Sequence, residues 1–541
     1  MKWLTFCAAA LACLAAAHAQ SLTGRWAGNG STTDNGMEIV VALNQGADGR
    51  ITGYVLGRSQ DTITDGKIED GKITLEAERP GRNGDTQKVT YTAVIEDGKL
   101  KLTMPMFGGG RGPGRGPAGT PGAAPGTPPA AAAAPGRSPG GGRGPQVFEL
   151  ARVSTEVPKP LPPKPAAVSL SFPAPVKSNG LAKTPPMGWN SWNKFSNRVS
   201  DQMVREMADA FVKSGMRDAG YIYVNIDDTW EGAHRDAHGN ITTNNKFPDM
   251  KALADYVHSK GLKLGIYSSP GPKTCAGYEG SYQHEEQDAK TYASWGIDYL
   301  KYDWCSASQV YDNTQATMAA AYAKMGEALE HSGRNIVYSL CQYGNLDVGE
   351  WGARVSGNLW RTTGDIRDTW ASMSHIGFDL QPGREKYAGT GHWNDPDMLE
   401  IGNGGMTEIE YQTHMSLWSL LAAPLLAGND LRDMKPEVAA ILMNKEVIAI
   451  DQDSPGKQGV RVAKDGDQEV WAKPLADGGY AVGLFNRGDA ASKITAKWSD
   501  IGVTGTRKLR DLWKHQDLGS MSDSFSAEVP SHGVALVKIA K

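Results

Sequence analysis

The sequence predicts a multidomain protein, with a catalytic (β/α)8 TIM barrel between an N-terminal all-β domain and a C-terminal antiparallel β-sandwich. The chain has 541 residues, which is too long for one ordinary domain. Strand-like and helical runs alternate over residues 181–453, as parallel βα units do. Short runs of alternating apolar and polar residues flank this region on both sides, over residues 20–155 and 454–541.

The first 19 residues have the pattern of a secretory signal peptide. Lys2 supplies the charged start, an Ala- and Leu-rich stretch follows, and Ala17-His18-Ala19 fits the small-residue cleavage pattern. The apolar stretch is too short for a good transmembrane helix. We therefore expect an exported protein, periplasmic or extracellular, that has no membrane association after cleavage.

The N-terminal all-β domain is expected over residues 20–155. Asp70-Gly71 and Asp97-Gly98 lie between apolar runs, which is a strong signal for β-hairpins. Residues 108–145 are almost entirely Gly, Pro and Ala and are expected to be disordered. Because residues 147–153 again resemble a strand, this stretch is either a loop before the domain's last strand or a plain linker. The strands fit a barrel or a sandwich, and a Pro-rich linker follows over residues 156–180.

The central region contains eight strand-like apolar runs with helical segments between most of them. One helix is expected from the N-cap Ser200 to the stop at Gly215, and another begins with a capping box, Thr407 with Glu410. Eight such units in about 270 residues match a (β/α)8 barrel. The competing architecture is an open doubly wound sheet. The expected strands lie at 187–192, 221–226, 262–267, 299–302, 336–340, 359–362, around Trp393, and at 425–426.

Charge and cysteine content narrow the functional classes. The net charge of −4 gives no indication of nucleic-acid binding. Five cysteines fall to three after signal cleavage, and an exported protein can keep a disulfide. We favour a bond between Cys275 and Cys305, because both follow adjacent strand ends. No paired Cys or His spacing supports a zinc site, so neither a metal nor another cofactor is expected.

Two segments that contain a carboxylate point to chemistry at the barrel mouth. Residues 300–305 contain Asp303 and residues 360–365 end in Asp365, each after a strand-like run. The carboxyl ends of barrel strands face the active site. Two carboxylates from different strands are what a glycosidase needs, although each could instead cap the helix that follows it.

Further polar residues follow other strands. Lys301 and Asp303 are two apart, so they share a face, and the ammonium favours the ionised form of Asp303. Asp227 and Asp228 end another strand and suit vicinal hydroxyls. Asp397 lies in a third acidic segment, 392–397, in which some carboxylates are expected to support or cap rather than bind.

The motifs in this region resemble those of the α-galactosidases of glycoside hydrolase family 27, the melibiases. The resemblance runs in order from about Leu181 to past Gln458 and leaves residues 20–180 uncovered. It rests on TPPMGWNSW (184–192), NIDDTW (225–230), GLKLGIY (261–267), KTCAG (273–277), KYDWC (301–305), RTTGDIRDTW (361–370) and WNDPDM (393–398).

The resemblance implies a retaining exo-acting mechanism on terminal α-D-galactosyl residues. Asp303 falls at the nucleophile position and Asp365 at that of the acid/base. Cys275 and Cys305 fall where the family has a disulfide. The substrate contacts implied are Trp192 on the sugar ring, Asp227 and Asp228 on the 4- and 6-hydroxyls, Lys301 on the 3- and 4-hydroxyls, Arg361 on the 2-hydroxyl, and Asp397 lining the site.

One segment departs from the family pattern. Many members have Cys-Glu-Trp where this chain has Cys341-Gln342-Tyr343. Gln342 can still hydrogen-bond a 2-hydroxyl, and neither it nor Tyr343 is small enough to favour an N-acetyl group. We therefore expect an α-galactoside oligosaccharide or glycan as substrate. The alternatives are a β-L-arabinopyranosidase, an α-N-acetylgalactosaminidase, or a carbohydrate-binding protein without catalysis.

Overall fold

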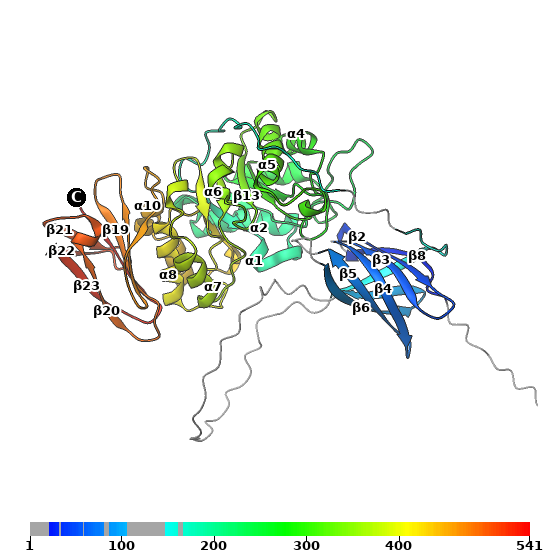
Figure 1. Ribbon diagram of the computed structural model, residues 1–541. Coiled ribbons are helices and arrows are strands. Elements are labelled where there is room, and N and C mark those ends of the chain that lie inside the picture. Colours follow the sequence, from blue (N-terminus) through cyan, green and yellow to red (C-terminus); the bar gives the residue numbers. More distant parts are fainter. Residues whose placement is uncertain (1–20, 32–33, 58, 81–85, 105–145, 161–165) are drawn as a thin grey trace, which may run out of the picture.

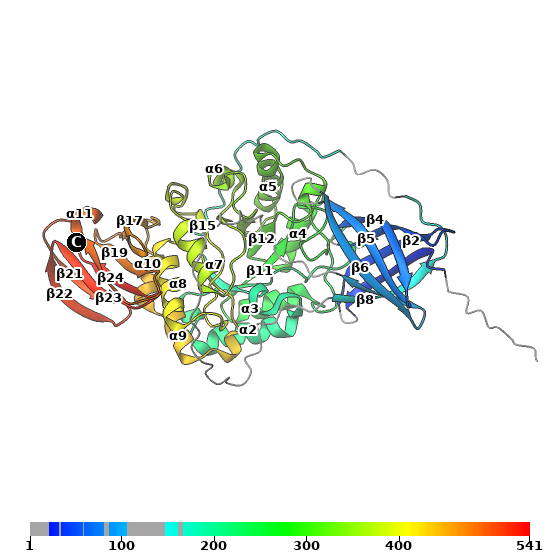
Figure 2. The ribbon, with the colours of Figure 1, turned by 60° about the horizontal axis from the view of Figure 1, so that its bottom comes forward.

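The computed structural model describes residues 21–31, 34–57, 59–80, 86–104, 146–160 and 166–541. The predicted signal peptide and the predicted disordered stretch 108–145 lie outside these residues. Three bodies stand in a row, with the catalytic barrel between the two all-β domains (Figures 1 and 2). The predicted fold class is confirmed.

The N-terminal domain is a closed antiparallel β-barrel. Of the two architectures that the sequence left open for this domain, the barrel is therefore correct. Its eight strands pair in chain order, and the last strand returns to pair with the first. Tryptophan and aliphatic side chains from alternate positions fill the interior. The strands are β1 (Gly24–Ser31), β2 (Asp34–Gln45), β3 (Ile51–Leu56), β4 (Gln60–Glu69), β5 (Lys72–Pro80), β6 (Thr86–Glu96), β7 (Lys99–Met104) and β8 (Gln146–Ser154).

A charged cluster lies inside this barrel. Asp61 is fully buried, and the guanidinium of Arg79 donates from Nε to its Oδ1 at 2.9 Å. The hydroxyl of Tyr91 donates to the same carboxylate and accepts from Arg79 Nη2 at 2.8 Å. Burial, with the adjacent Asp61 carboxylate, raises the pKa of Tyr91, so the phenol keeps its proton.

The catalytic domain is an eight-stranded parallel sheet rolled into a ring. Its first seven strands pair in chain order and β16 pairs with β9, an order that excludes a doubly wound sheet. A bridge between Leu399 and Ala427 joins the two ends of the sheet. The strands are β9 (Met187–Asn190), β10 (Tyr223–Asn225), β11 (Lys263–Ser268), β12 (Tyr299–Asp303), β13 (Val337–Cys341), β14 (Leu359–Arg361), β15 (Trp393–Asp395) and β16 (Leu425–Ala427).

Helices connect these strands and pack around the ring (Figure 2). Both predicted helix starts are confirmed: Ser200 accepts from Met203 N, and Thr407 and Glu410 form a capping box. Gly215 ends its helix at φ 89°, where glycine is favoured. The helices are α1 (Trp192–Phe195), α2 (Asp201–Ser214), α3 (Met250–Ser259), α4 (Glu285–Trp295), α5 (Gln315–Glu330), α6 (Val348–Trp351), α7 (Trp370–Ser374), α8 (Glu408–Leu420), α9 (Pro436–Leu442) and α10 (Lys445–Asp451).

The C-terminal domain is an antiparallel sandwich with its own apolar core. One sheet has six strands in the order β17, β18, β19, β24, β21, β22, and the other pairs β20 with β23. The elements are β17 (Val460–Asp465), β18 (Gln468–Pro474), β19 (Tyr480–Asn486), β20 (Ser492–Lys497), α11 (Trp498–Ile501), β21 (Thr506–Asp511), β22 (Gln516–Ser522), β23 (Ser524–Val529) and β24 (Val534–Ile539).

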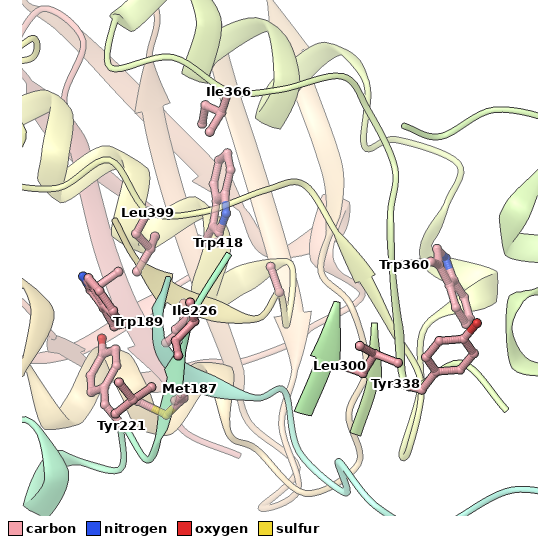
Figure 3. Packing of buried hydrophobic residues seen from close by; sticks show 14 of the residues in the cluster. Met187, Trp189, Tyr221, Ile226, Leu300, Tyr338, Trp360, Ile366, Leu399 and Trp418 are labelled. Carbon is pink, nitrogen blue, oxygen red and sulfur yellow. The ribbon is translucent and has the colours of Figure 1, made fainter. Parts of the chain in front are cut away.

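The core of the catalytic barrel continues into this sandwich. Trp471, Phe485 and Leu536 of the sandwich belong to the same buried cluster as the barrel side chains. Figure 3 shows part of this cluster, including Trp360 and Trp418. The two domains therefore share one apolar interior. Within the described residues, no helix has the length and apolar character needed to cross a bilayer.

The N-terminal barrel also meets the catalytic domain through buried apolar contacts. Ala276 and Tyr278 belong to the loop that follows β11, yet both pack into the core of the N-terminal barrel and are 4% exposed. His234 of the catalytic domain lies 3.7 Å from Glu38 of the N-terminal barrel. The N-terminal barrel, which we also call the accessory domain, therefore packs against a loop at the mouth of the catalytic barrel.

Replacing Asp61 with alanine tests the charged cluster of the N-terminal barrel. The change leaves the Arg79 guanidinium buried without its carboxylate, so we expect a loss of about 3–5 kcal/mol in the unfolding free energy of this domain. Calorimetry of the whole chain should show an earlier first transition. Asp65→Ala, on the same strand, removes an exposed ion pair with Arg50 and should cost less than about 1 kcal/mol. Equal effects of the two variants would contradict this account.

Candidate active site

The polar residues identified in the sequence gather at the carboxyl ends of the barrel strands. Asp303 is the last residue of β12 and Arg361 the last of β14. Parallel strands start at one end of the ring and finish at the other, so these side chains converge. The others follow strand ends closely: Trp192 after β9, Asp227 and Asp228 after β10, Gln342 after β13, Asp365 after β14, and Asp397 after β15. A separate cavity lined by Tyr223, Lys263 and Arg334 lies at the amino ends of the strands.

Asp303 is a buried carboxylate with one oxygen held and one without a partner. The hydroxyl of Tyr267 donates to its Oδ2 at 3.2 Å. Its Oδ1 is buried and has no hydrogen-bond partner among the described residues. Burial raises the pKa of Asp303 to about 6, against the opposing effect of Lys301. An unpartnered carboxylate oxygen at a strand end is available for nucleophilic attack.

Lys301 pairs more closely with Asp227 than with Asp303. Its Nζ donates to Asp227 Oδ2 at 2.7 Å, and Asn190 Nδ2 donates to the same oxygen at 2.8 Å. Burial opposes the charge of the amine, but the Asp227 carboxylate holds the pKa of Lys301 well above its usual range. The expected effect of Lys301 on Asp303 is present, yet desolvation outweighs it, so the pKa of Asp303 rises overall.

Arg361 connects two carboxylates on the other side of the site. Its Nη2 lies 2.9 Å from Asp397 Oδ2 and 3.2 Å from Asp365 Oδ1. The Arg361 side chain is buried, whereas the Asp365 side chain is 70% exposed. An exposed carboxyl beside a buried one suits an acid/base that must exchange protons with water. Asp365 also acts on Asp303, because the negative charge of Asp365 raises the pKa of Asp303.

Asp228 is fixed by backbone amides. Ala276 N donates to its Oδ2 at 2.6 Å and Thr229 N to its Oδ1 at 2.7 Å. The first donor belongs to the loop that packs into the N-terminal barrel. A disulfide joins Cys275 of this loop to Cys305, two residues after Asp303. The accessory domain, the disulfide and one carboxylate of the site are therefore mechanically connected.

Gln342 is fully buried, and neither its Oε1 nor its Nε2 has a hydrogen-bond partner among the described residues. A buried amide without partners is costly, and native proteins seldom leave one so. Because Gln342 directly follows β13 at the mouth of the barrel, a bound polar group would satisfy it.

Two tyrosines of the site were not identified from the sequence as contacts of Asp303. Tyr267 lies in β11, and its hydroxyl contacts the Asp303 carboxylate. Tyr343 hydrogen-bonds the same carboxylate from the segment after β13. Tyr267 could have been found from its position one residue before the end of a barrel strand. Nothing in the local pattern of Tyr343 marks it, because its orientation depends on a left-handed backbone at φ 61°.

The donor set does not form a metal centre. Cys275, Cys305 and Asp303 each place one ligand-type atom within 4.8 Å of the others. Since the two sulfurs are bonded to each other, neither is a thiolate that could bind a metal. What remains is a ring of carboxylates, two cations and aromatic rings at the top of a TIM barrel. This arrangement defines the class, a glycoside hydrolase.

Comparisons with known proteins define the family. Residues 184–453 match the family model of alpha galactosidase A, and residues 465–539 match that of the alpha galactosidase C-terminal beta sandwich domain. Alpha-galactosidase 2 of Arabidopsis thaliana is 49% identical over 371 residues, 68% of this chain and 92% of that protein. The chain therefore belongs to the α-galactosidase family of glycoside hydrolases.

Solved structures agree with this assignment. The structure of alpha-galactosidase I from Mortierella vinacea superposes with a TM-score of 0.65 at 40% identity, covering 67% of this chain and 98% of that one. A Bacteroides fragilis protein provisionally assigned as an alpha-galactosidase has a TM-score of 0.64 at 29% identity. That match covers 96% of this chain and 99% of the Bacteroides chain, so it extends over nearly the whole protein.

Asp303→Asn should stabilise the protein at neutral pH. The pKa of this carboxyl is raised from 3.8 to about 6, so its ionisation favours the unfolded chain as pH rises through that window. About two pK units correspond to roughly 3 kcal/mol of unfolding free energy. Asp303→Asn should gain this stability above about pH 6 and should gain none of it below about pH 4. Urea unfolding at these two pH values measures it. Asp255→Asn, at an exposed position in α3, should leave the unfolding free energy unchanged at both pH values. An Asp303→Asn variant no more stable than wild type would contradict the raised pKa of Asp303.

Proposed function

We propose that this protein is a retaining exo-α-galactosidase, which removes terminal α-D-galactosyl residues from oligosaccharides or glycans. The observation that carries this is the pair Asp303 and Asp365 in an α-galactosidase-family barrel. Asp303 is buried with one free oxygen, and Asp365 is exposed and held by Arg361. These are the properties of a nucleophile and an acid/base respectively.

The reaction proceeds by double displacement. Oδ1 of Asp303 attacks the anomeric carbon, the glycosidic bond breaks, and Asp365 gives its proton to the departing oxygen. Asp365 then takes a proton from water, which attacks the same carbon and returns the bonding electrons to Asp303. Galactose leaves with its α configuration retained.

The proposed contacts with the sugar are those that the family resemblance implies. Asp227 and Asp228 accept from the 4- and 6-hydroxyls, Lys301 donates to the 3- and 4-hydroxyls, and Arg361 donates to the 2-hydroxyl. Asp397, which accepts from Ile366 N and pairs with Arg361, supports that cation. Trp192 stacks on the ring face, as indoles do on sugars.

Galactose is favoured over the two related sugars by specific residues. A carboxylate at Asp228 would have no hydroxymethyl group to bind in an arabinopyranoside. An N-acetyl group at the 2-position would have to displace Gln342, which is fully buried. A binding protein without catalysis is disfavoured because both carboxylates are in place.

We also propose that the enzyme works outside the cytoplasm. The signal-like segment 1–19 supports this, as does the disulfide at the active site. Such a location matches a substrate class of soluble oligosaccharides or exposed glycan ends.

Hydrolysis of p-nitrophenyl α-D-galactopyranoside tests the proposal. Wild type should release nitrophenol with retained configuration by NMR, and Asp303→Ala should lose at least about 10³-fold in kcat. Asp255→Ala, an exposed carboxylate in α3, is the matched control and should keep full activity. No turnover by folded wild type, or equal turnover by Asp303→Ala, would overturn the proposal. Preference for the α-N-acetylgalactosaminide or the β-L-arabinopyranoside would instead establish one of the alternatives.

The pH profile should have its acidic limb near pH 6. Asp303 must be ionised to attack, and burial raises its pKa to about 6. The value of kcat/KM for the aryl galactoside should therefore fall about tenfold per pH unit below that point. A profile that stays flat down to about pH 4 would show that the attacking group has an ordinary pKa.

Gln342→Ala should weaken galactoside hydrolysis and broaden specificity. Loss of one hydrogen bond to the 2-hydroxyl corresponds to about 1.4 kcal/mol, or about tenfold in kcat/KM. The space released should raise relative activity on the α-N-acetylgalactosaminide. Unchanged ratios between the two aryl glycosides would show that Gln342 does not face the 2-position.

A further inference from the structure

We propose that Tyr343 is a positioning residue for the nucleophile, a second phenolic donor that holds Asp303 ionised and assists its departure from the sugar in the second step. This inference rests on the proposed function and deepens it. It concerns the segment after β13, where Gln342 and Tyr343 follow each other.

The geometry places the Tyr343 hydroxyl against the nucleophile. The residue has φ 61°, in the left-handed region that a bulky side chain seldom adopts. This backbone turns the ring toward β12, and the phenol hydrogen-bonds the Asp303 carboxylate. Its oxygen also lies 3.4 Å from Cys275 Sγ and 3.8 Å from Cys305 Sγ.

The direction of this hydrogen bond follows from the chemistry of its partners. Disulfide sulfurs carry no proton and are weak acceptors, whereas a carboxylate is a strong acceptor. The hydroxyl of Tyr343 therefore donates its single proton to Asp303. The disulfide packs against the hydroxyl oxygen without accepting that proton. The pKa of Tyr343 is raised well above its usual range by burial and by the charge of Asp303, so the phenol remains a donor.

Tyr267, in β11, and Tyr343, in the segment after β13, thus act on the same carboxylate from either side of β12. Tyr267 donates to Oδ2, while Oδ1 remains buried without a partner among the described residues. The two cations of the site are engaged elsewhere, because Lys301 pairs with Asp227 and Arg361 with Asp397. The charge of Lys301 nevertheless lowers the pKa of Asp303, and the hydrogen bond from Tyr343 lowers it further.

The two chemical steps use these donors differently. In the first step the Asp303 carboxylate gives up charge as the bond to the anomeric carbon forms. In the second step that bond breaks, its electron pair returns to Asp303, and the proton of the attacking water passes to Asp365. Donors aimed at the carboxylate stabilise the charge that develops in the second step. Loss of the Tyr343 hydroxyl should therefore slow the second step more than the first.

Tyr343→Phe tests this with two kinetic readouts. The acidic limb of kcat/KM should move upward by about one pH unit, because one hydrogen bond to the ionised form is lost. With 2,4-dinitrophenyl α-D-galactopyranoside, whose leaving group needs little protonation, the variant should show a pre-steady-state burst larger than that of wild type. Its kcat should fall about tenfold, as the second step becomes slower. Tyr338→Phe is the matched control, since that buried tyrosine of β13 donates to the Tyr322 carbonyl instead.

A second variant separates the chemistry from packing. Replacing Tyr343 with 3-fluorotyrosine keeps the shape of the ring and makes the phenol a stronger donor. The acidic limb should then move downward, the opposite of the Tyr343→Phe shift. A merely structural role predicts no such reversal, and the same profile in both variants and wild type would overturn the inference.

A measurement without turnover keeps the two proposals distinguishable. The pH dependence of the unfolding free energy, compared between each chain and its Asp303→Asn counterpart, reports the pKa of Asp303. In Tyr343→Phe this pKa should be about one unit higher than in wild type. An unshifted pKa would refute the role of Tyr343, whether or not galactosides are hydrolysed. A shifted pKa in a protein without galactosidase activity would refute the proposed function alone.

Discussion

The proposed active site depends on gathering several carboxylates in a buried place while the proposed nucleophile, Asp303, stays ionised. Asp227, Asp303 and Asp397 are all buried at the barrel mouth, and burial raises the pKa values of Asp303 and Asp397. Two buried cations, Lys301 and Arg361, offset this cost by pairing with Asp227 and Asp397, the carboxylates near the proposed nucleophile. The ionised form of Asp303 is stabilised by the charge of Lys301 and by hydrogen bonds from Tyr343 and Tyr267.

The barrel strands explain how so many charges can meet. Parallel strands bring residues from distant parts of the sequence to one rim, and each contributes only one or two side chains there. Below the rim the strands are apolar, and Trp418 of α8 belongs to the same buried cluster as Leu300 of β12 (Figure 3). The indole of Trp418 donates to the Asp397 carbonyl at 2.8 Å, which ties this cluster to the acidic rim.

Much of the architecture could be predicted because buried strands leave continuous apolar runs in the sequence. Asp303 and Asp365 could be located because each follows such a run. Strands β1 and β4 leave no such signal, since one is rich in glycine and the other is largely polar. The contact of Tyr343 with Asp303 could not be predicted, because it depends on a left-handed backbone and on a neighbouring strand. The raised pKa of Asp303 also depends on burial, which local charge alone does not reveal.

The loop carrying Ala276 and Tyr278 has a consequence for how such chains can be recombined. Its tip completes the core of the N-terminal barrel, while its backbone and its cysteine belong to the catalytic rim. The boundary between the two domains in space therefore does not coincide with a boundary in the sequence. An accessory barrel transplanted from a relative would carry a vacancy in its core unless the recipient's loop were exchanged with it. The N-terminal barrel and this loop therefore form one structural unit built from two separate parts of the sequence. We expect these two parts to change together as the family diverges.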